Sequence, residues 1–408
     1  MTRFNRSLAG PAIIMAAFVT IMAGCEKEES QQLASASRIP IRISVNAAGS
    51  TKSEAMNTPK LEASEGFALD VWTDDSWYYY DDDGKRIGDE QPAGQYINSN
   101  GKVNVVYSSA HHHDTGRSDD MVTDGWYISD DSGIETYNWI TSVRMRFWAM
   151  YPKNADVDSE TEGIRVITTS PTSGSDEMEF EYTLPKHKDG YDATNQKDLL
   201  FAYNDVVKTN KNGSNMLSAD EDNIDLTFNH PLSEIRFCVS PDDGTFDTGL
   251  KIKSIGIWYI PKSGTCVFHG NGKIKPGEGE TPMFEWVPST DLERYSQQYN
   301  VMFDTKPSGW TASEYGSEGK QLYTCENAFR VIPHKTSEYA MIVINISDDI
   351  LGERQIQVQF NNGFPDCDVW KPGHYYTYKI NATTIGREIA ASVSLFDWTD
   401  RQSTIPIM

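Results

Sequence analysis

The chain has 408 residues, of which 59 are acidic and 36 are basic, and its formal net charge is −23 at pH 7. A surface this acidic cannot neutralise phosphates, so the charge balance argues against nucleic acid as a partner. The length allows two domains that each bury a core of their own.

The N-terminus has the features of a lipoprotein signal peptide. A basic start precedes the apolar run Ala12 to Met22, which is shorter than the roughly 20 residues of a transmembrane helix. The small residues directly before Cys25 resemble the lipobox cut by lipoprotein signal peptidase. The resemblance implies that residues 1–24 are removed and that Cys25 is acylated.

Residues 25–37 are predicted to form an acidic and polar tether. The segment Glu26 to Glu29 resembles the signal with which Bacteroidetes export lipoproteins to the outer leaflet. The following residues are mainly Gln, Ser and Ala, a composition that also suits a plain solvated tether. We therefore expect the lipid on Cys25 to anchor the chain in the outer membrane, at the cell surface.

Alternation of apolar and polar side chains predicts an all-β mature chain. In the first predicted strand, Pro40 has no N–H for a ladder, so we expect this strand at a sheet edge. Met341 to Ile346 is apolar on both faces and is predicted to be a central strand. The apolar residues of the first strand and of three half-buried strands are Ile39, Ile41, Ile43 and Val45; Val143, Met145, Phe147 and Ala149; Ile235, Phe237 and Val239; and Ile356, Val358 and Phe360.

Many short strands joined by polar, turn-rich connections indicate sandwiches or barrels. The polar tract Lys208 to Asn223 is the best linker candidate. It predicts an N-terminal β-sandwich domain over 38–220 and a C-terminal β-sandwich domain over 221–408. Four cysteines remain after Cys25, and their three possible pairings are left open: Cys238, Cys266, Cys325 and Cys367.

Four segments in this order resemble the fimbrillin-like lipoproteins of Bacteroidetes, a family of type V pilin-like proteins. They are NWITSVRMRFWAMYP (138–152), NQKDLLFA (195–202), LTFNHPLSEIRFCV (226–239) and WKPGHYYTYKI (370–380). The resemblance implies two tandem transthyretin-like β-sandwich domains. For pilin members it also implies a structural or adhesive subunit of a pilus that assembles by donor-strand exchange.

In donor-strand exchange, a protease releases the first strand and a strand of another subunit fills the groove. The strand from Ile39 to Val45 is the displaceable candidate. Arg38 precedes it and Lys52 follows it, so release of the whole strand requires cleavage near Lys52 rather than at Arg38. The donor candidate alternates Ile389, Ala391, Val393 and Leu395 with smaller or polar residues, although this segment equally suits the last strand of its own domain. The expected partners are other pilin subunits or a second copy, the outer membrane, and a ligand on a host or bacterial surface.

We find no motif that predicts an enzyme, a cofactor or a metal site. Consecutive residues of an extended segment point to opposite faces, so His111, His112 and His113 cannot all reach one ion. His230 is interpreted as a hydrogen-bonded structural residue. The run Asp81 to Gly84 is interpreted as a turn.

The alternative function is that of a monomeric glycan-binding surface lipoprotein. Its basis is an aromatic cluster that could stack on sugar rings if it were exposed. Burial of these side chains would count against this alternative. The cluster consists of Trp72, Trp77, Tyr78, Tyr79 and Tyr80.

Overall fold

A computed structural model of the chain describes 22 segments that lie within one compact unit, residues 34–408. The described residues are 35–47, 66–80, 86–97, 104–108, 111–112, 121–122, 125–130, 133–134, 137–152, 165–168, 174–184, 198–208, 223–241, 250–290, 301–302, 310–315, 320–325, 329–337, 339–348, 352–360, 369–382 and 389–397.

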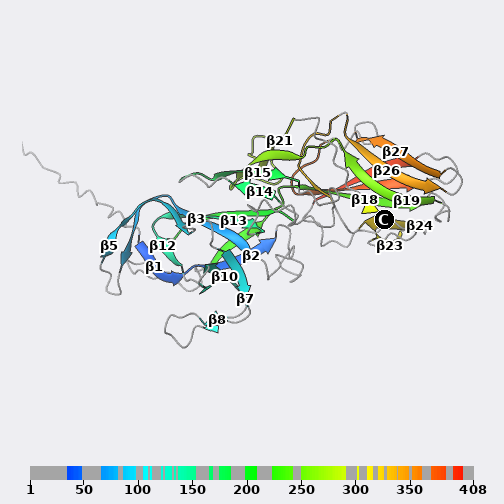
Figure 1. The fold of residues 1–408 in the computed structure, drawn as a ribbon. Helices are drawn as coiled ribbons and strands as arrows, with labels where there is room; N and C mark the ends of the chain where they lie inside the picture. The colour runs from blue at the N-terminus through cyan, green and yellow to red at the C-terminus, as the bar shows by residue number, and fades with distance from the viewer. Residues whose placement is uncertain are drawn as a thin grey trace, which may run out of the picture. The chain divides into compact units, whose positions relative to one another are not determined.

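Strands β1 to β29 make up the regular structure, and no helix is present among the described residues (Figure 1). The predicted all-β class is therefore confirmed. Within the same residues, no helix has the length and the apolar character that a membrane span requires.

A nine-stranded sheet encloses the first core, in the order β16-β13-β3-β7-β10-β2-β17, with β6 beside β3 and β11 beside β10. Phe201 in the end strand β16 and Asn229, directly after the end strand β17, exchange backbone hydrogen bonds of 3.0 and 2.8 Å, so the two ends of the sheet meet. Its strands are β2 (Arg42–Ala47), β3 (Phe67–Thr73), β6 (Gly94–Ile97), β7 (Asn104–Ser108), β10 (Gly125–Asp130), β11 (Gly133–Ile134), β13 (Arg144–Tyr151), β16 (Leu200–Val207) and β17 (Asn223–Phe228).

Two four-stranded sheets and a two-stranded ribbon are formed in addition to the nine-stranded sheet. The first sheet has the order β12 (Asn138–Thr141), β1 (Ser35–Pro40), β4 (Trp77–Tyr80), β5 (Arg86–Gln91). The second has the order β14 (Arg165–Thr168), β15 (Glu177–Thr183), β20 (Ser263–His269), β21 (Phe284–Pro288). The ribbon pairs β8 (His111–His112) with β9 (Met121–Val122).

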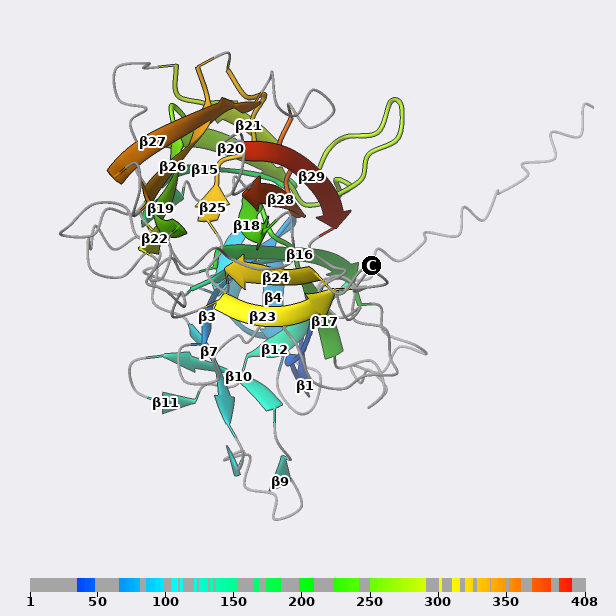
Figure 2. The ribbon, with the colours of Figure 1, turned by 90° about the vertical axis from the view of Figure 1, so that its right-hand side faces the viewer.

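Two further sheets hold most of the C-terminal half, and Figure 2 shows β28 beside β29 in one of them. That sheet has the order β23 (Trp310–Tyr315), β24 (Lys320–Cys325), β18 (Ser233–Pro241), β28 (His374–Ala382), β29 (Ile389–Asp397), with β25 (Phe329–Val331) beside β18. The other has the order β22 (Val301–Met302), β19 (Leu250–Trp258), β26 (Met341–Asp348), β27 (Gly352–Gln359).

Strands from both sides of residue 220 share sheets. β17 pairs with β2 in the nine-stranded sheet, and β15 pairs with β20 in the four-stranded sheet that begins with β14. The division into two sandwich domains near residue 220 stays a prediction. The prediction of a central strand at Met341 to Ile346 is confirmed, because β26 lies between β19 and β27 and buries Ile342, Val343 and Ile344.

Strand β13 corrects the prediction of a half-buried strand. Phe147 packs in the core under the nine-stranded sheet. Trp148, on the opposite face, belongs to a second, larger core, in which its ring centre lies 5.4 Å from that of Phe268. Arg146 is only 6% exposed, although the sequence pattern places it on the solvent side. Both faces of β13 are covered because two cores flank it.

The turn between β20 and β21 depends on Gly272. A Cβ at this position would lie 2.6 Å from both the backbone O of Pro282 and the Cα of Met283. We expect Gly272→Ala to lower the free energy of unfolding by about 2 kcal/mol, because the backbone must shift to make room.

The measurement for Gly272→Ala is urea denaturation, with Gly277→Ala as its control. A Cβ at Gly277 would meet only the flexible end of the Glu280 side chain, at 3.3 Å. Equal midpoints for the two variants would contradict this account of the turn.

Candidate functional site

The N-terminal strand that the sequence singles out is split between two sheets. Pro40 ends β1, and the N–H of Ile41 donates to the carbonyl of Tyr137 (2.7 Å) before β2 begins at Arg42. β1 lies between β12 and β4, and β2 lies between β10 and β17. The prediction of an edge strand is therefore wrong. The missing N–H of Pro40 is accommodated by the break between two strands rather than by an edge position.

Strand β2 forms its longest ladder with β17. The two strands are parallel over six positions, from Arg42 opposite Asn223 to Ala47 opposite Phe228. By contrast, the ladder between β2 and β10 has a single position, Trp126 opposite Ile43. Most of the backbone pairing that holds β2 in place therefore comes from one neighbour.

The apolar face of β2 completes the first core. Ile43 of β2 is 7% exposed, and Val45 packs against the same core while half-buried; Ile41, directly before β2, is 8% exposed and joins them. Leu226 and Phe228 of β17 are at most 1% exposed. Loss of β2 would uncover an apolar slot beside β17 and leave one edge of β17 unpaired.

The other predicted assembly residues are placed only in part. Arg38 and Ile39 lie in β1, whereas Cys25 and Lys52 lie outside the described residues. The donor candidates Ile389, Ala391, Val393 and Leu395 lie in β29, which pairs with β28 over nine positions at the end of its sheet.

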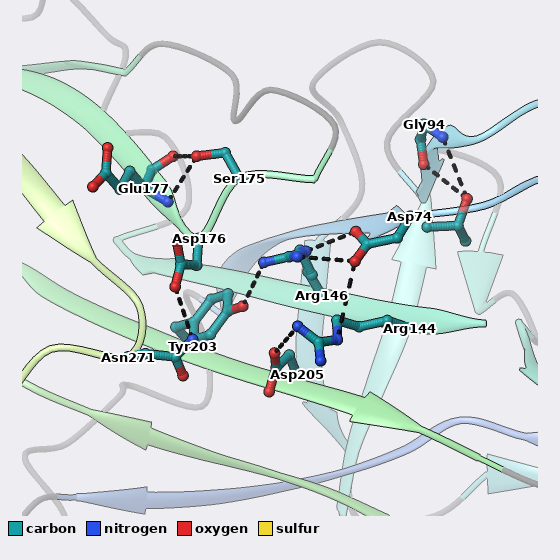
Figure 3. Close-up of polar contacts among 11 residues, drawn as sticks. Asp74, Gly94, Arg144, Arg146, Ser175, Asp176, Glu177, Tyr203, Asp205 and Asn271 are labelled. Carbon is teal, nitrogen blue, oxygen red and sulfur yellow. Dashed lines mark hydrogen bonds and ion pairs between the residues drawn. The ribbon is translucent and has the colours of Figure 1, made fainter. Parts of the chain in front are cut away.

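A polar cluster that the sequence analysis missed connects β13 to its neighbours. Nε and Nη2 of Arg146 donate to the two carboxylate oxygens of Asp74, at 2.7 and 2.9 Å, and Nη1 donates to the hydroxyl of Tyr203 at 3.3 Å (Figure 3). Arg144 reaches the carboxylate of Asp205 at 3.6 Å. The only sequence signal was an Arg within a strongly apolar strand.

The chemistry of this cluster is structural. Burial, followed by the charge of Asp205, raises the pKa of Tyr203 to about 12, so its hydroxyl does not act as an acid or a base near neutral pH. The hydrogen bond with Asp74 raises the pKa of Arg146, which keeps the guanidinium charged. The cluster therefore holds the turn that follows β3 against strands β13 and β16.

A second polar cluster joins the sequence motifs. Asp198 of the NQKDLLFA segment lies 3.1 Å from Nδ1 of His230 and 3.4 Å from Nε of Arg330. Glu234 is fully buried and accepts a hydrogen bond from Nε of Arg236 at 2.6 Å. The interpretation of His230 as a hydrogen-bonded structural residue is confirmed.

The closing motif, residues 370–380, packs against the same region. The hydroxyl of Ser233 donates to the carbonyl of Lys371 (2.8 Å), and Nε1 of Trp370 donates to the hydroxyl of Tyr378 (2.8 Å). The N–H of Gly373 donates to the carbonyl of Leu232 (3.1 Å). The motifs therefore mark residues that hold the sheets together.

The aromatic cluster proposed for glycan contact is mostly covered. Trp77 is 5% exposed, with its ring 5.2 Å from that of Tyr96, and Trp72 and Tyr78 are half-buried. Tyr79 alone among the described side chains of this cluster is well exposed, at 46%. A single ring is a poor platform for a sugar chain.

The described residues were also compared with the requirements of metal and thiol sites. Within the described residues, no group of three or more His, Cys, Asp or Glu could hold a metal ion. Cys266 has a free, buried thiol whose pKa burial raises well above its ordinary value. Asp81 to Gly84 and His113 lie outside the described residues, whereas the backbone of His111 and His112 forms β8.

The fold and the site define an all-β protein whose polar clusters hold strands together. The sequence profile of the fimbrillin-like family matches residues 94–398, three quarters of the chain. The chain belongs to the fimbrillin-like family. The family supports a structural role at the cell surface, as a subunit of a pilus or in cell adhesion, with other pilin subunits as partners.

Solved structures of low sequence identity also resemble the chain. A fimbrial protein from Bacteroides vulgatus is 14% identical with a TM-score of 0.47, and the match covers 88% of this chain and 99% of that one. A candidate cell adhesion protein from Bacteroides ovatus is 15% identical with a TM-score of 0.40, over 88% and 97%. No curated protein matches the chain.

Proposed function

We propose that the chain is a pilus subunit that reaches the outer membrane anchored through the lipid on Cys25, and that proteolysis behind β2 frees it from the lipid and lets a strand of another subunit replace β2. The position of β2 supports this proposal most directly. Its ladder is formed mainly with β17, and Ile43 of β2 and Ile41 directly before it fill the core beneath the nine-stranded sheet.

The energetics favour refilling of the slot. Burial of Ile41 and Ile43 stabilises the fold by roughly 1.5–3 kcal/mol each, before ordering entropy is deducted. Together these terms are comparable with a large part of the roughly 5–15 kcal/mol net stability of a domain. A chain that has lost β2 therefore gains substantially by binding an incoming strand, which adds backbone hydrogen bonds as well as side chains.

The acceptor role can follow from a single proteolytic cut, whereas the donor role needs a ladder to open within the folded chain. To accept a strand, the chain must lose the segment that contains β1 and β2, together with its pairing to β12, β4, β10 and β17. To donate β29, it must first break nine paired positions with β28. We therefore propose the acceptor role for the cleaved chain, with Cys25 as the membrane anchor before cleavage and β29 as the donor in a copy that polymerises.

Trypsin treatment of the lipid-free chain tests the acceptor role. Cleavage after Lys52 or Lys60 separates the first strands from the rest, and we expect SDS-resistant, heat-sensitive oligomers on a non-reducing gel once mass spectrometry shows loss of the N-terminal peptide. The control is the double variant Lys52→Gln, Lys60→Gln, which keeps all other cleavage sites and should stay monomeric. A single monomer band after loss of the peptide would contradict the proposal that the cleaved chain polymerises by strand exchange.

A further inference from the structure

Strand β27 presents a regular sheet edge that no described strand covers. It is the last strand of its sheet (Figure 1), and it pairs with β26 over eight consecutive positions without a bulge. Proteins usually block such edges with charges, bulges or prolines, because an open edge pairs with other strands.

The backbone of β27 has a defined inner and outer side. The N–H of Phe360 donates to the carbonyl of Ala340 at 3.0 Å, directly after the last pair of the ladder. Because hydrogen-bonding residues alternate along an antiparallel strand, Val358 and Ile356 also turn their backbone groups toward β26. Gln355 and Gln357 therefore turn their N–H and C=O groups outward.

Two other edge strands of the fold, β5 and β21, carry such protection, and β27 does not. In β5, charged residues accompany Gly88, whose φ is +70°, and the register with β4 shifts between Trp77 and Tyr79. β21 ends in Pro288. The segment Gln355 to Phe360 has no charge and no Pro, and the charged pair Glu353 and Arg354 lies at one end of the strand.

The side chains of β27 are complementary to a second copy of the same strand. On the exposed face, Nε2 of Gln357 donates to Oε1 of Gln355 (2.8 Å), and Nε2 of Gln355 donates to Oδ1 of Asn345 (3.1 Å). The amide of Gln357 keeps an acceptor oxygen and a second N–H with which to extend this chain of amides. On the other face, Ile356 and Val358 pack against the core.

The negative net charge of the chain also favours pairing at the uncharged edge of β27. The chain has a net charge of −23, so two copies repel each other over most of their surfaces. An uncharged strand is a place where they can meet without like charges in direct opposition.

We propose that β27 is a lateral self-association surface, on which the β27 strands of two copies pair antiparallel with Gln357 opposite Gln357. Gln355 then lies opposite residue 359 of the other copy, and Ile356 lies opposite Val358. Two four-stranded sheets become one continuous sheet. A single strand pair buries less than the roughly 1,200 Å² of a standard interface, so the dimer is weak and forms at high local concentration.

This contact does not depend on strand exchange, because β27 is present in the uncleaved chain. Its test therefore uses the uncleaved, lipid-free chain, and the outcome for the proposed pilus role is separate. A Gln357→Cys variant is left to oxidise in air at about 100 μM, a concentration chosen for a weak interface, and analysed by non-reducing gel and light scattering.

We expect Gln357→Cys to form at least about tenfold more disulfide-linked dimer than Glu353→Cys, because opposite Cα atoms lie about 5.5 Å apart, inside the roughly 4.4–6.8 Å that a disulfide spans. In this register the two copies of residue 353 lie roughly 25 Å apart. The parent chain gives the background from its own cysteines.

A second pair of variants tests the edge without a new thiol. Gln357→Lys places two ammonium groups opposite each other and should abolish the dimer in light scattering without lowering the thermal midpoint, since Gln357 is exposed. Glu353→Lys, outside the central pairs, should leave the dimer intact. A parent chain that stays monomeric, or equal cross-linking at residues 353 and 357, overturns the proposal.

Discussion

Replacing Arg236 by Met is expected to lower the free energy of unfolding by about 3–5 kcal/mol, because breaking a buried ion pair by removing one partner is strongly destabilising. The carboxylate of Glu234 is fully buried, and Nε of Arg236 lies 2.6 Å from its Oε1. Nη2 of Arg236 contacts the same oxygen, and the guanidinium lies 4.6 Å from the ring centre of Tyr375. Met fills much of the same volume but offers no charge.

The measurement for Arg236→Met is the urea midpoint, with two comparisons. Arg144→Met makes the same change at a side chain that is 49% exposed and 3.6 Å from Asp205, where an ion pair contributes under about 1 kcal/mol. The double variant Arg236→Met, Glu234→Gln should recover most of the loss, because it removes the buried charge. A loss of similar size for Arg144→Met, or no recovery in the double variant, would refute the buried-charge explanation.

The sequence predicts the all-β class well because the apolar alternation is local. Ile235 and Phe237 of β18 are buried as their spacing predicts, and the continuous apolar run of β26 is buried at Ile342, Val343 and Ile344 as expected for a strand covered on both faces. Such patterns need no knowledge of which strands pair.

The partner of β2 could not be predicted from the same pattern. β17 begins some 180 residues later in the chain, and its pairing with β2 is parallel, so no turn sequence connects the two. The alternation of Ile224, Leu226 and Phe228 predicts a strand, but nothing in it names the neighbour. The edge position expected for β2 was wrong for this reason.

The polar clusters depend on equally distant contacts. The burial of Arg146 becomes favourable only because Asp74 binds it, and the two residues are 72 positions apart in the chain. Asp198 and Arg330 are farther apart still, and they meet beside His230. The alternation of apolar and polar residues alone predicts that Arg146 is exposed to solvent. It takes no account of a distant partner such as Asp74, which comes close only in the folded chain.

His334 is expected to destabilise the chain as the pH falls from 6.5 to 4. Burial lowers the pKa of His334 to about 4, an effect that the hydrogen bond from Nδ1 to the carbonyl of Ile332 (2.7 Å) opposes only in part. Its Nε2 is buried without a hydrogen-bond partner in the described structure, and its ring packs edge-on against Trp370. A proton therefore binds the unfolded chain more readily than the folded one.

The sign and size of this effect follow from the two pKa values. Above pH 6.5 the imidazole is neutral in both states and contributes no pH dependence. Between pH 6.5 and 4 only the unfolded chain takes up the proton, so the free energy of unfolding falls by about 3 kcal/mol across this window. Below pH 4 both states are protonated and the effect levels off.

Comparison with His334→Asn isolates this contribution. The Asn amide can still donate to the carbonyl of Ile332, but it does not titrate. Carboxylates change the stability of both proteins in the same way, so the difference in free energy of unfolding between the parent and the variant, measured in urea from pH 7 to pH 4, reports His334 alone. We expect this difference to shift in favour of the variant by about 3 kcal/mol over the window. A difference that does not vary with pH would mean that His334 takes up its proton as easily in the folded chain as in the unfolded one.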